Sequence, residues 1–466
     1  MKISRCIISA LCAVALGVFL LPAAVAAAPV ELVIDSAHPA GEIDLTRYSL
    51  GQGGLSHEPM FDVHLDQVAR LKPRTIRLFV QEFFDLYPER GRYHWDTLDR
   101  SLENILATGA KPLLSLCFKP RVLYPQTDQD IVHPTDYAEW EALIEALVRH
   151  CNQEKGYGIE YWEVGNEVDI GESGGCPYRF SPRDYTRYYS HTVRAVLRAD
   201  PGVKVGGPAL ASYGSPIGDA LIEFCGRGET PLDFFSWHMY GNDPLRLRQS
   251  IREIKQKLAP YPKLAATETV IDEWNIKLLG EEKTPGFQAA FVLESTLGFL
   301  EEGLSLSSYY HIRDHFVKPE DFTWMPPEGY RFMADWWNVQ VQNSGLFDKQ
   351  GNRRPAYYVF QMLSHIQGRR LQVSGITGEV HAFAAQQGGT THVVFWNFPL
   401  SGSGAKKEVV LRFAAGQPGN FRLLKLNAAS NRLEELRTGA AAALEANPLR
   451  LELAPYEVAW AQLGVK

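Results

Sequence analysis

Cysteine is scarce in this chain of 466 residues, and several common functional motifs are missing from it. None of the six cysteines forms a C-x-x-C pair, and so few cysteines in a chain this long are no disulfide scaffold; no His, Asp and Cys set has metal-site spacing. No G-x-G-x-x-G follows a candidate strand and no candidate strand ends in a G-x-S-x-G nucleophile elbow, so neither a dinucleotide-binding fold nor a serine hydrolase has support. An excess of positive charge is also lacking. The 47 Lys and Arg against 54 Asp and Glu argue against binding of nucleic acid.

Long hydrophobic runs are absent after the N-terminus. Lys2 and Arg5 precede an apolar stretch from Ile7 to Leu21, and small residues follow at 23–28. This order predicts a secretory signal peptide over residues 1–27, with a retained membrane anchor as the alternative. No later stretch approaches the roughly 20 apolar residues needed to span a bilayer, so we expect no membrane span in the mature chain and a secreted or periplasmic location.

Short β-rich runs alternate with helix-like segments between about residues 45 and 345. The segment 182–199 begins like a helix, with Ser181 as N-cap and Pro182 at the first helical position. Eight alternations over about 300 residues predict a (β/α)8 TIM barrel; a doubly wound open sheet is the rival. The candidate strands are Tyr48–Gly54, Thr75–Val80, Pro112–Phe118, Ile159–Gly165, Lys204–Pro208, Phe234–Tyr240, Ala266–Trp274 and Ser305–Ile312.

The pattern changes after Pro355, where short alternating runs are separated by Gly, Pro, Ser and Asn. This is typical of an antiparallel β-sandwich. We therefore predict a catalytic barrel over residues 45–354, an accessory β-sandwich domain over 355–466, and an N-terminal strand segment, 28–44, that joins the sandwich. The runs are Val380–Ala384, Thr391–Asn397, Glu408–Phe413, Phe421–Leu426, Leu449–Leu453 and Val458–Leu463.

Polar residues at the carboxyl ends of barrel strands are the candidates for a site, because active sites of this fold lie there. The fourth strand ends in Asn166-Glu167 and the seventh in Asp272-Glu273, so two carboxylates face each other across the barrel mouth. Glycoside hydrolysis uses such a pair, one protonated and one ionised. Asp272 adjoins Glu273 and is expected on the opposite side of the strand, and Glu268 is a second rival for the role of Glu273.

Other polar side chains on apolar strands support this hypothesis. His238 and Tyr240, two positions apart on the sixth strand, can orient or hydrogen-bond the nucleophile, although a buried histidine is often structural. Arg77 would keep Glu273 ionised, or form a buried ion pair inside the barrel. Asn166 would donate a hydrogen bond to the sugar 2-hydroxyl.

With these residues in place, the chain resembles the clan A glycoside hydrolases, which are retaining, and within them family 39, which holds β-xylosidases, α-L-iduronidases and some exopolysaccharide glycosidases. The resemblance is spread over most of residues 45–360. It is carried by Thr75–Arg77, Phe118–Pro120, Trp162–Glu167, Val205–Ala209, Ser236–Tyr240 and Asp272–Asn275.

The resemblance implies that Glu167 is the acid/base and Glu273 the nucleophile of a double displacement that needs no metal or organic cofactor. Trp274 stands beside Glu273 as a substrate-binding candidate, and Tyr310 occupies the place where many members have a Trp beneath the sugar. Lys119 is a candidate to receive an acidic sugar or is a solvated loop charge. The expected partner is an oligo- or polysaccharide. The alternatives are a catalytically idle carbohydrate-binding barrel of an export system and an endo-acting enzyme on an acidic exopolysaccharide.

Four cysteines follow the predicted signal peptide. An oxidising compartment would allow one or two bridges among them, and the sequence does not pair them. They are Cys117, Cys151, Cys176 and Cys225.

Overall fold

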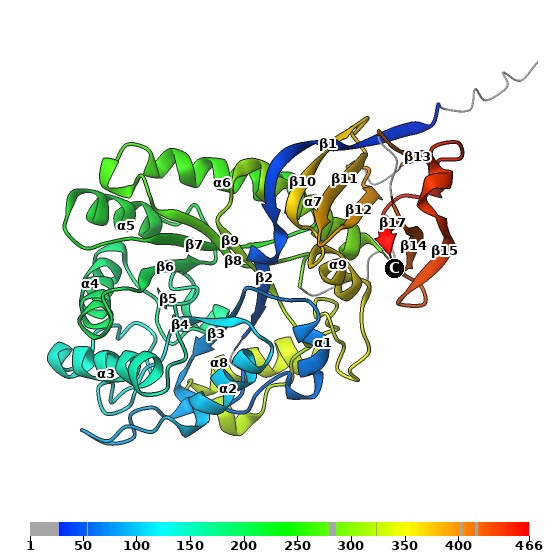
Figure 1. Cartoon of the computed structure of the whole chain (residues 1–466). Helices are drawn as coiled ribbons and strands as arrows, with labels where there is room; N and C mark the ends of the chain where they lie inside the picture. Colours follow the sequence, from blue (N-terminus) through cyan, green and yellow to red (C-terminus); the bar gives the residue numbers. More distant parts are fainter. Residues whose placement is uncertain are drawn as a thin grey trace, which may run out of the picture.

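The computed structural model describes residues 28–53, 55–278, 286–322, 324–400, 404–414 and 418–465 (Figure 1). The predicted signal peptide lies outside these ranges. Within them, no helix has the length and apolar character needed to cross a membrane. The four cysteines after it are buried, free thiols, so neither of the bridges that the sequence allowed is formed.

Eight parallel strands close into a barrel in the order in which they occur in the chain, which confirms the TIM barrel. Nearly all of their side chains are buried, because a parallel barrel is covered by helices outside and filled by side chains inside. The strands are β2 (Tyr48–Gln52), β3 (Thr75–Val80), β4 (Lys111–Leu116), β5 (Tyr161–Val164), β6 (Lys204–Leu210), β7 (Phe234–Tyr240), β8 (Glu268–Asn275) and β9 (Leu306–Tyr310).

Helices surround this barrel (Figure 1). The predicted start of α4 is confirmed, since the Ser181 side chain accepts a hydrogen bond from the backbone N–H of Asp184 and Pro182 occupies the first helical position. The helices are α1 (Leu65–Ala69), α2 (Asp96–Ala107), α3 (Tyr137–Arg149), α4 (Pro182–Ala199), α5 (Pro216–Arg227), α6 (Pro244–Leu258), α7 (Phe287–Glu302), α8 (Pro327–Ala334) and α9 (Pro355–Leu363).

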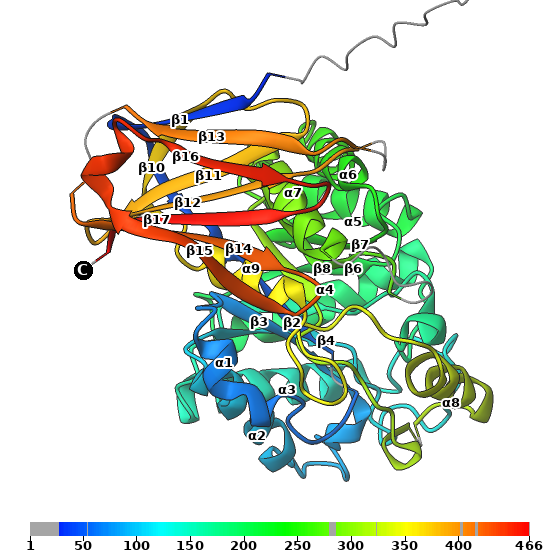
Figure 2. The same ribbon diagram turned by 90° about the vertical axis from the view of Figure 1, so that its right-hand side faces the viewer.

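A curled nine-stranded sheet forms the second part of the molecule, beside α7 and α9 (Figure 2). β1 lies between β10 and β13, so a strand from the start of the chain is built into the C-terminal sheet. Its pairing with β13 is parallel, which makes the sheet mixed instead of wholly antiparallel. The strands are β1 (Val30–Asp44), β10 (Gln367–Ser374), β11 (Val380–Gln387), β12 (Thr390–Asn397), β13 (Lys407–Phe413), β14 (Asn420–Asn427), β15 (Arg432–Ala440), β16 (Leu449–Leu453) and β17 (Val458–Val465).

The connections that follow the barrel strands build the mouth of the barrel. After β5 comes the short turn η5 (Gly171–Gly174), and after β9 a long connection carries α8 and the helical turn η8 (Asp335–Val339). These segments form one wall of the cavity at the carboxyl ends of the strands, which is where this fold places its chemistry.

Candidate active site

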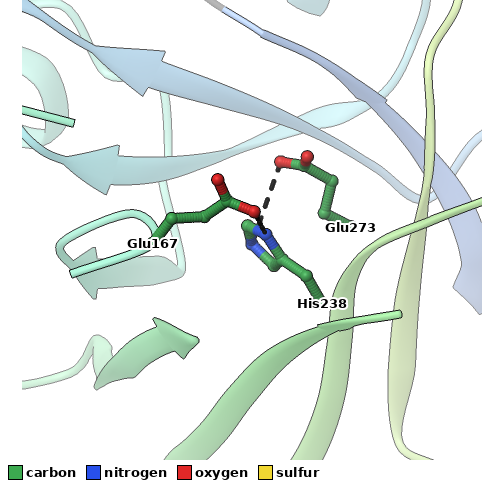
Figure 3. A group of neighbouring side chains, drawn as sticks. All are labelled: Glu167, His238 and Glu273. Atoms are coloured by element: carbon green, nitrogen blue, oxygen red, sulfur yellow. Dashed lines mark hydrogen bonds and ion pairs between the residues drawn. The ribbon is translucent and has the colours of Figure 1, made fainter. Parts of the chain in front are cut away.

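Glu167 and Glu273 meet at the carboxyl ends of β5 and β8, as the sequence predicted (Figure 3). Together with His238 they present atoms that all lie within 4.8 Å of one another. Retaining glycosidases place the two carboxyl groups about 5–5.5 Å apart, whereas inverting enzymes leave roughly 6.5–9.5 Å for a water molecule. The separation therefore fits a direct attack on the sugar by one of the two glutamates.

Glu167 reaches the cavity because the chain turns sharply after β5. Gly165 has φ +99° and Glu167 itself φ +45°, a left-handed conformation that is uncommon for residues other than glycine. The backbone N–H of Glu167 donates to the carbonyl of Ala209 at 2.7 Å, which fixes the turn to β6. Its side chain keeps 13% exposure and lines the cavity.

Glu273 is more deeply buried and is held by two donors. The Arg77 guanidinium Nη1 lies 3.1 Å from its Oε2, and the Tyr240 hydroxyl donates to its Oε1 at 2.5 Å. Burial raises the pKa of Glu273, and the charges of His238 and Arg77 and the hydrogen bond from Tyr240 act in the opposite direction. The Arg77 and Tyr240 contacts place both residues in the supporting roles that the sequence suggested.

A β-bulge in β8 changes the expected side-chain alternation. The pairing with β7 shifts register after Ile271, so that Asp272 and Glu273 both point into the barrel, where each contacts Arg77. The expectation that Asp272 lies on the opposite side of the strand is therefore wrong. Trp274 takes the outward position instead, fully buried against Phe299 of α7 with ring centroids 4.9 Å apart, so the structure corrects its assignment as a substrate-binding residue.

The sequence suggested that His238 orients the nucleophile candidate Glu273, but in the structure His238 contacts Glu167. Its Nδ1 lies 2.9 Å from Oε1 of Glu167 and its Nε2 lies 3.3 Å from Oδ2 of Asp272, whereas Glu273 is 3.8 Å away. Burial alone would lower the pKa of His238, but the carboxylates of Glu273 and Asp272 and hydrogen bonds to Asp272 and Glu167 raise it well above its ordinary value. The imidazole is therefore a charged donor to Glu167.

Arg77 connects all of these groups. Besides Glu273 and Asp272, its guanidinium donates to Oε2 of Glu163 at 2.7 Å and to Oδ1 of Asn166 at 2.9 Å. The Asn166 Nδ2 has one long contact, 3.4 Å to the carbonyl of Gly174, and Asn166 lines the cavity beside Glu167. Sequence reasoning missed Glu163, although a lone charge on an apolar strand was the signal that had identified Arg77.

The cavity above the glutamates has a volume of about 320 Å³, at the small end of the range for ligand sites. Tyr310 lines it, as predicted, and stacks on Phe79. Aromatic side chains from α8 and η8, together with the exposed Lys277, complete the wall and were not predicted. Those from α8 and η8 are Phe332, Trp336 and Trp337.

Two other predicted or rival residues lie away from this cavity. The ammonium group of Lys119 donates to the carbonyls of Asp128 and Pro177 and lies over the rings of Tyr124 and Tyr178, so it ties two loops together; burial lowers its pKa to about 8. Glu268 begins β8 at the opposite end of the barrel, where it pairs with Lys204 at 2.7 Å. Lys119 is thus placed in a structural position, and Glu268 is no rival to Glu273.

A metal ion is the other chemistry that Glu167, His238 and Glu273 suggest, since two carboxylates and an imidazole are common ligands. An imidazole must be neutral to bind a metal, and the raised pKa of His238 works against that state. The donor set therefore fits proton transfer better than metal binding.

Comparison with known proteins assigns most of the chain to one family. A family model described as "Glycosyl hydrolases family 39" matches residues 84–400. The β-xylosidase of Caldicellulosiruptor saccharolyticus is 26% identical over 305 residues, which are 59% of this chain and 57% of that protein. The aligned part thus spans little more than half of that relative.

Solved structures match this chain over nearly its full length. A monomeric β-xylosidase from Caulobacter crescentus has a TM-score of 0.72 at 20% identity, covering 93% of this chain and 99% of that one. A glucosidase from Croceicoccus marinus also has a TM-score of 0.72, at 17% identity, with 94% and 99% coverage. At these identities the similarity shows the fold.

Proposed function

Because the chain belongs to family 39 of the glycosyl hydrolases and is a retaining glycosidase of clan A, we propose that Glu167 is its acid/base and Glu273 its nucleophile. The observation that carries this proposal is the approach of the two carboxylates within 4.8 Å at the floor of an aromatic-lined cavity. Their surroundings differ, and the contacts of Glu273 act against the rise in its pKa that burial causes. Glu273 faces Arg77 and Tyr240, which favour its ionised form, and Glu167 is partly exposed to the leaving group.

In the first step, Glu167 donates its proton to the glycosidic oxygen as the bond to C1 breaks and a Glu273 oxygen forms an ester with C1. In the second step, Glu167 removes a proton from water, whose oxygen attacks C1 and releases Glu273. Two inversions leave the configuration retained. Nδ2 of Asn166 is the donor available for the sugar 2-hydroxyl, since its Oδ1 already accepts from Arg77.

We propose that the substrate is an oligo- or polysaccharide that places one sugar ring in the cavity. Tyr310 and the aromatic side chains of α8 and η8 offer faces on which the C–H groups of a pyranose ring can pack. The relatives named β-xylosidase and glucosidase direct the first assays to xylosides and glucosides. Lys277, an exposed ammonium at the rim, favours including uronides, which represent the acidic alternative.

Export of the protein is also part of the proposal. It is supported by the basic, apolar and small-residue order of residues 1–27. N-terminal sequencing of the protein from culture medium and periplasm tests this: a mature chain beginning near residue 28 is expected, and an intact Met1 would refute cleavage.

A panel of nitrophenyl glycosides, followed by a matching 2-fluoro sugar, tests the assignment of the glutamates. We expect labelling on Glu273, a loss of about 10²–10⁴-fold in Glu167→Ala, and rescue of that variant by azide with a glycosyl azide of retained configuration. Full activity in both Glu167→Ala and Glu273→Ala would refute the assignment. A folded protein that neither turns over nor is labelled by any sugar would support the idle carbohydrate-binding barrel.

A further inference from the structure

A pair of carboxyl groups lies beneath the two catalytic candidates. Glu163 on β5 and Asp272 on β8 have fully buried side chains. Arg77 contacts one oxygen of each, Oε2 of Glu163 at 2.7 Å and Oδ2 of Asp272 at 2.9 Å, and the two carboxyl groups lie within hydrogen-bonding reach of each other. The pair belongs to neither step of the reaction as described so far.

The close approach of these two buried carboxyl groups indicates that they hold one proton between them. Oε1 of Glu163 and Oδ1 of Asp272 are buried and accept no well-aligned hydrogen bond from the residues that the structure describes, although the Ser236 hydroxyl is near enough to Glu163 to lower its pKa. Two ionised carboxylates cannot hydrogen-bond each other, and such a pair in a buried site retains one proton. Burial and the neighbouring Asp272 charge also raise the pKa of Glu163 to about 8, whereas Arg77 and His238 lower that of buried Asp272.

The charges of the site balance only if Glu163 is neutral. Arg77 and His238 supply two positive charges. In the free enzyme, Asp272 and Glu273 supply two negative charges while Glu167 carries the acid proton. In the glycosyl-enzyme Glu273 is an ester and Glu167 is ionised, so two negative charges again remain. An ionised Glu163 would add an uncompensated buried charge to both states.

We propose that Glu163 and Asp272 share one proton, which Glu163 holds and donates to Asp272, and that the pair keeps His238 charged and directed at Glu167 in both halves of the reaction. Glu163 and Asp272 are thus positioning residues, acting through His238 on the acid/base. The kinetic part of this inference rests on the proposed function.

The groups that face His238 support the assignment of the shared proton to Glu163. Glu167 approaches Nδ1 from the turn after β5, and Asp272 and Glu273 approach Nε2 from β8. Arg77 is a second cation that contacts both of the β8 carboxylates. An ionised Asp272 stabilises the imidazolium most directly, and it stays ionised because Glu163 takes the shared proton.

Kinetics of two isosteric variants separate the roles. In Glu163→Gln the amide still donates to Asp272, so kcat/KM on an active aryl glycoside should fall by only about 3–10-fold. In Asp272→Asn the partner of His238 loses its charge, and kcat/KM should fall about 10²-fold with a changed pH profile. A Glu163→Gln variant that loses as much as Asp272→Asn would overturn the proposal, because it would mean that Glu163 acts as an anion.

The pH dependence of unfolding by urea tests, without any substrate, whether Glu163 holds the shared proton. The unfolded chain releases the Glu163 proton near pH 4.5, whereas the folded chain releases it near pH 8. Wild type should therefore lose stability relative to Glu163→Gln as pH rises from about 5 to 8. Glu160→Gln, at an exposed glutamate paired with Lys204, is the matched control and should show no such trend. A difference that is constant, or that grows in favour of wild type with rising pH, would refute the shared proton even if the proposed function holds.

A measurement on the wild-type chain covers the case in which Glu163→Gln does not fold. The protein is labelled with ¹⁵N-histidine, and NMR spectra of wild type and His238→Gln are compared. The ring resonances that are absent from the variant belong to His238. Both of its ring nitrogens should be protonated at pH 7, and Asp272→Asn should return the ring to a neutral tautomer. A neutral His238 in wild type at pH 7 would overturn the proposal.

Discussion

Replacement of Gly174 by alanine should remove activity while leaving the fold intact. Gly174 ends η5, and a Cβ placed there would lie 1.9 Å from Oε2 and 2.7 Å from Cβ of Glu167. The backbone of Gly174 is outside the left-handed region, so alanine causes no backbone strain. Oε2, Cβ and Cδ of Glu167 would all lie closer than 3.0 Å, so the whole side chain of the proposed acid/base must move together with the turn that carries it.

The size of the effect follows from this contact. An ordinary contact begins at 3.4 Å, so the carboxylate must shift by about 1.5 Å. A misplacement of about 1 Å in a reacting group can cost 10²-fold, equivalent to about 2.7 kcal/mol of activation free energy. We expect kcat/KM for a phenyl glycoside to fall by at least about this factor. Dinitrophenyl glycosides should suffer much less, because their leaving group departs without a proton.

The assay compares kcat/KM across aryl glycosides of graded leaving-group acidity, alongside thermal unfolding. Gly214→Ala is the matched control, because its new Cβ would meet nothing closer than 3.8 Å in the loop after β6. It should behave as wild type. Wild-type activity in Gly174→Ala, or an equal loss for every leaving group in a folded variant, would refute the placement of Glu167 as the acid.

Further predictions concern the nucleophile, the aromatic residues and metals. Tyr240→Phe removes a hydrogen bond that lowers the pKa of Glu273, so the acidic limb of the kcat/KM profile should move to higher pH; an unmoved limb would contradict this role. Trp274→Ala should destabilise the chain by about 3–5 kcal/mol with KM nearly unchanged, as measured by urea unfolding and steady-state kinetics. Trp336→Ala should instead raise KM, and an unaltered KM would remove it from the binding wall. Dialysis against EDTA should leave activity unchanged, because a protonated His238 does not hold a metal.

The barrel could be predicted from the sequence because buried parallel strands carry a strong signal. Runs such as Thr75–Val80 are rich in Ile, Leu, Phe and Val, are buried along their whole length and appear between helices. The two strands of the sheet that were missed, β10 and β15, are rich in Arg, Gln and Glu and have mostly part-exposed or exposed side chains. β15 also lies at the edge of the sheet, where polar residues are favoured.

The catalytic pair could be predicted because Glu167 and Glu273 stand at strand ends, where this fold collects its chemistry. The bulge in β8 could not be predicted, because it changes the side-chain alternation without a signal in the sequence such as a glycine. It brings Asp272 to Arg77, and the role proposed for Glu163 depends on this contact. The charged interior of the barrel thus depends on one local shift of register.

The aromatic wall of the cavity had a signal that was not used. The connection between β9 and α9 runs from residue 311 to 354, far longer than the usual loop of a βα unit, and such long connections are commonly functional. It is also dense in aromatic residues, with Phe332, Trp336 and Trp337 in one short stretch. The barrel itself supplies the proposed proton donor and nucleophile, whereas this connection supplies four of the residues that line the cavity, three of them aromatic. Differences in substrate between this chain and its relatives should therefore follow from this connection more than from the strands.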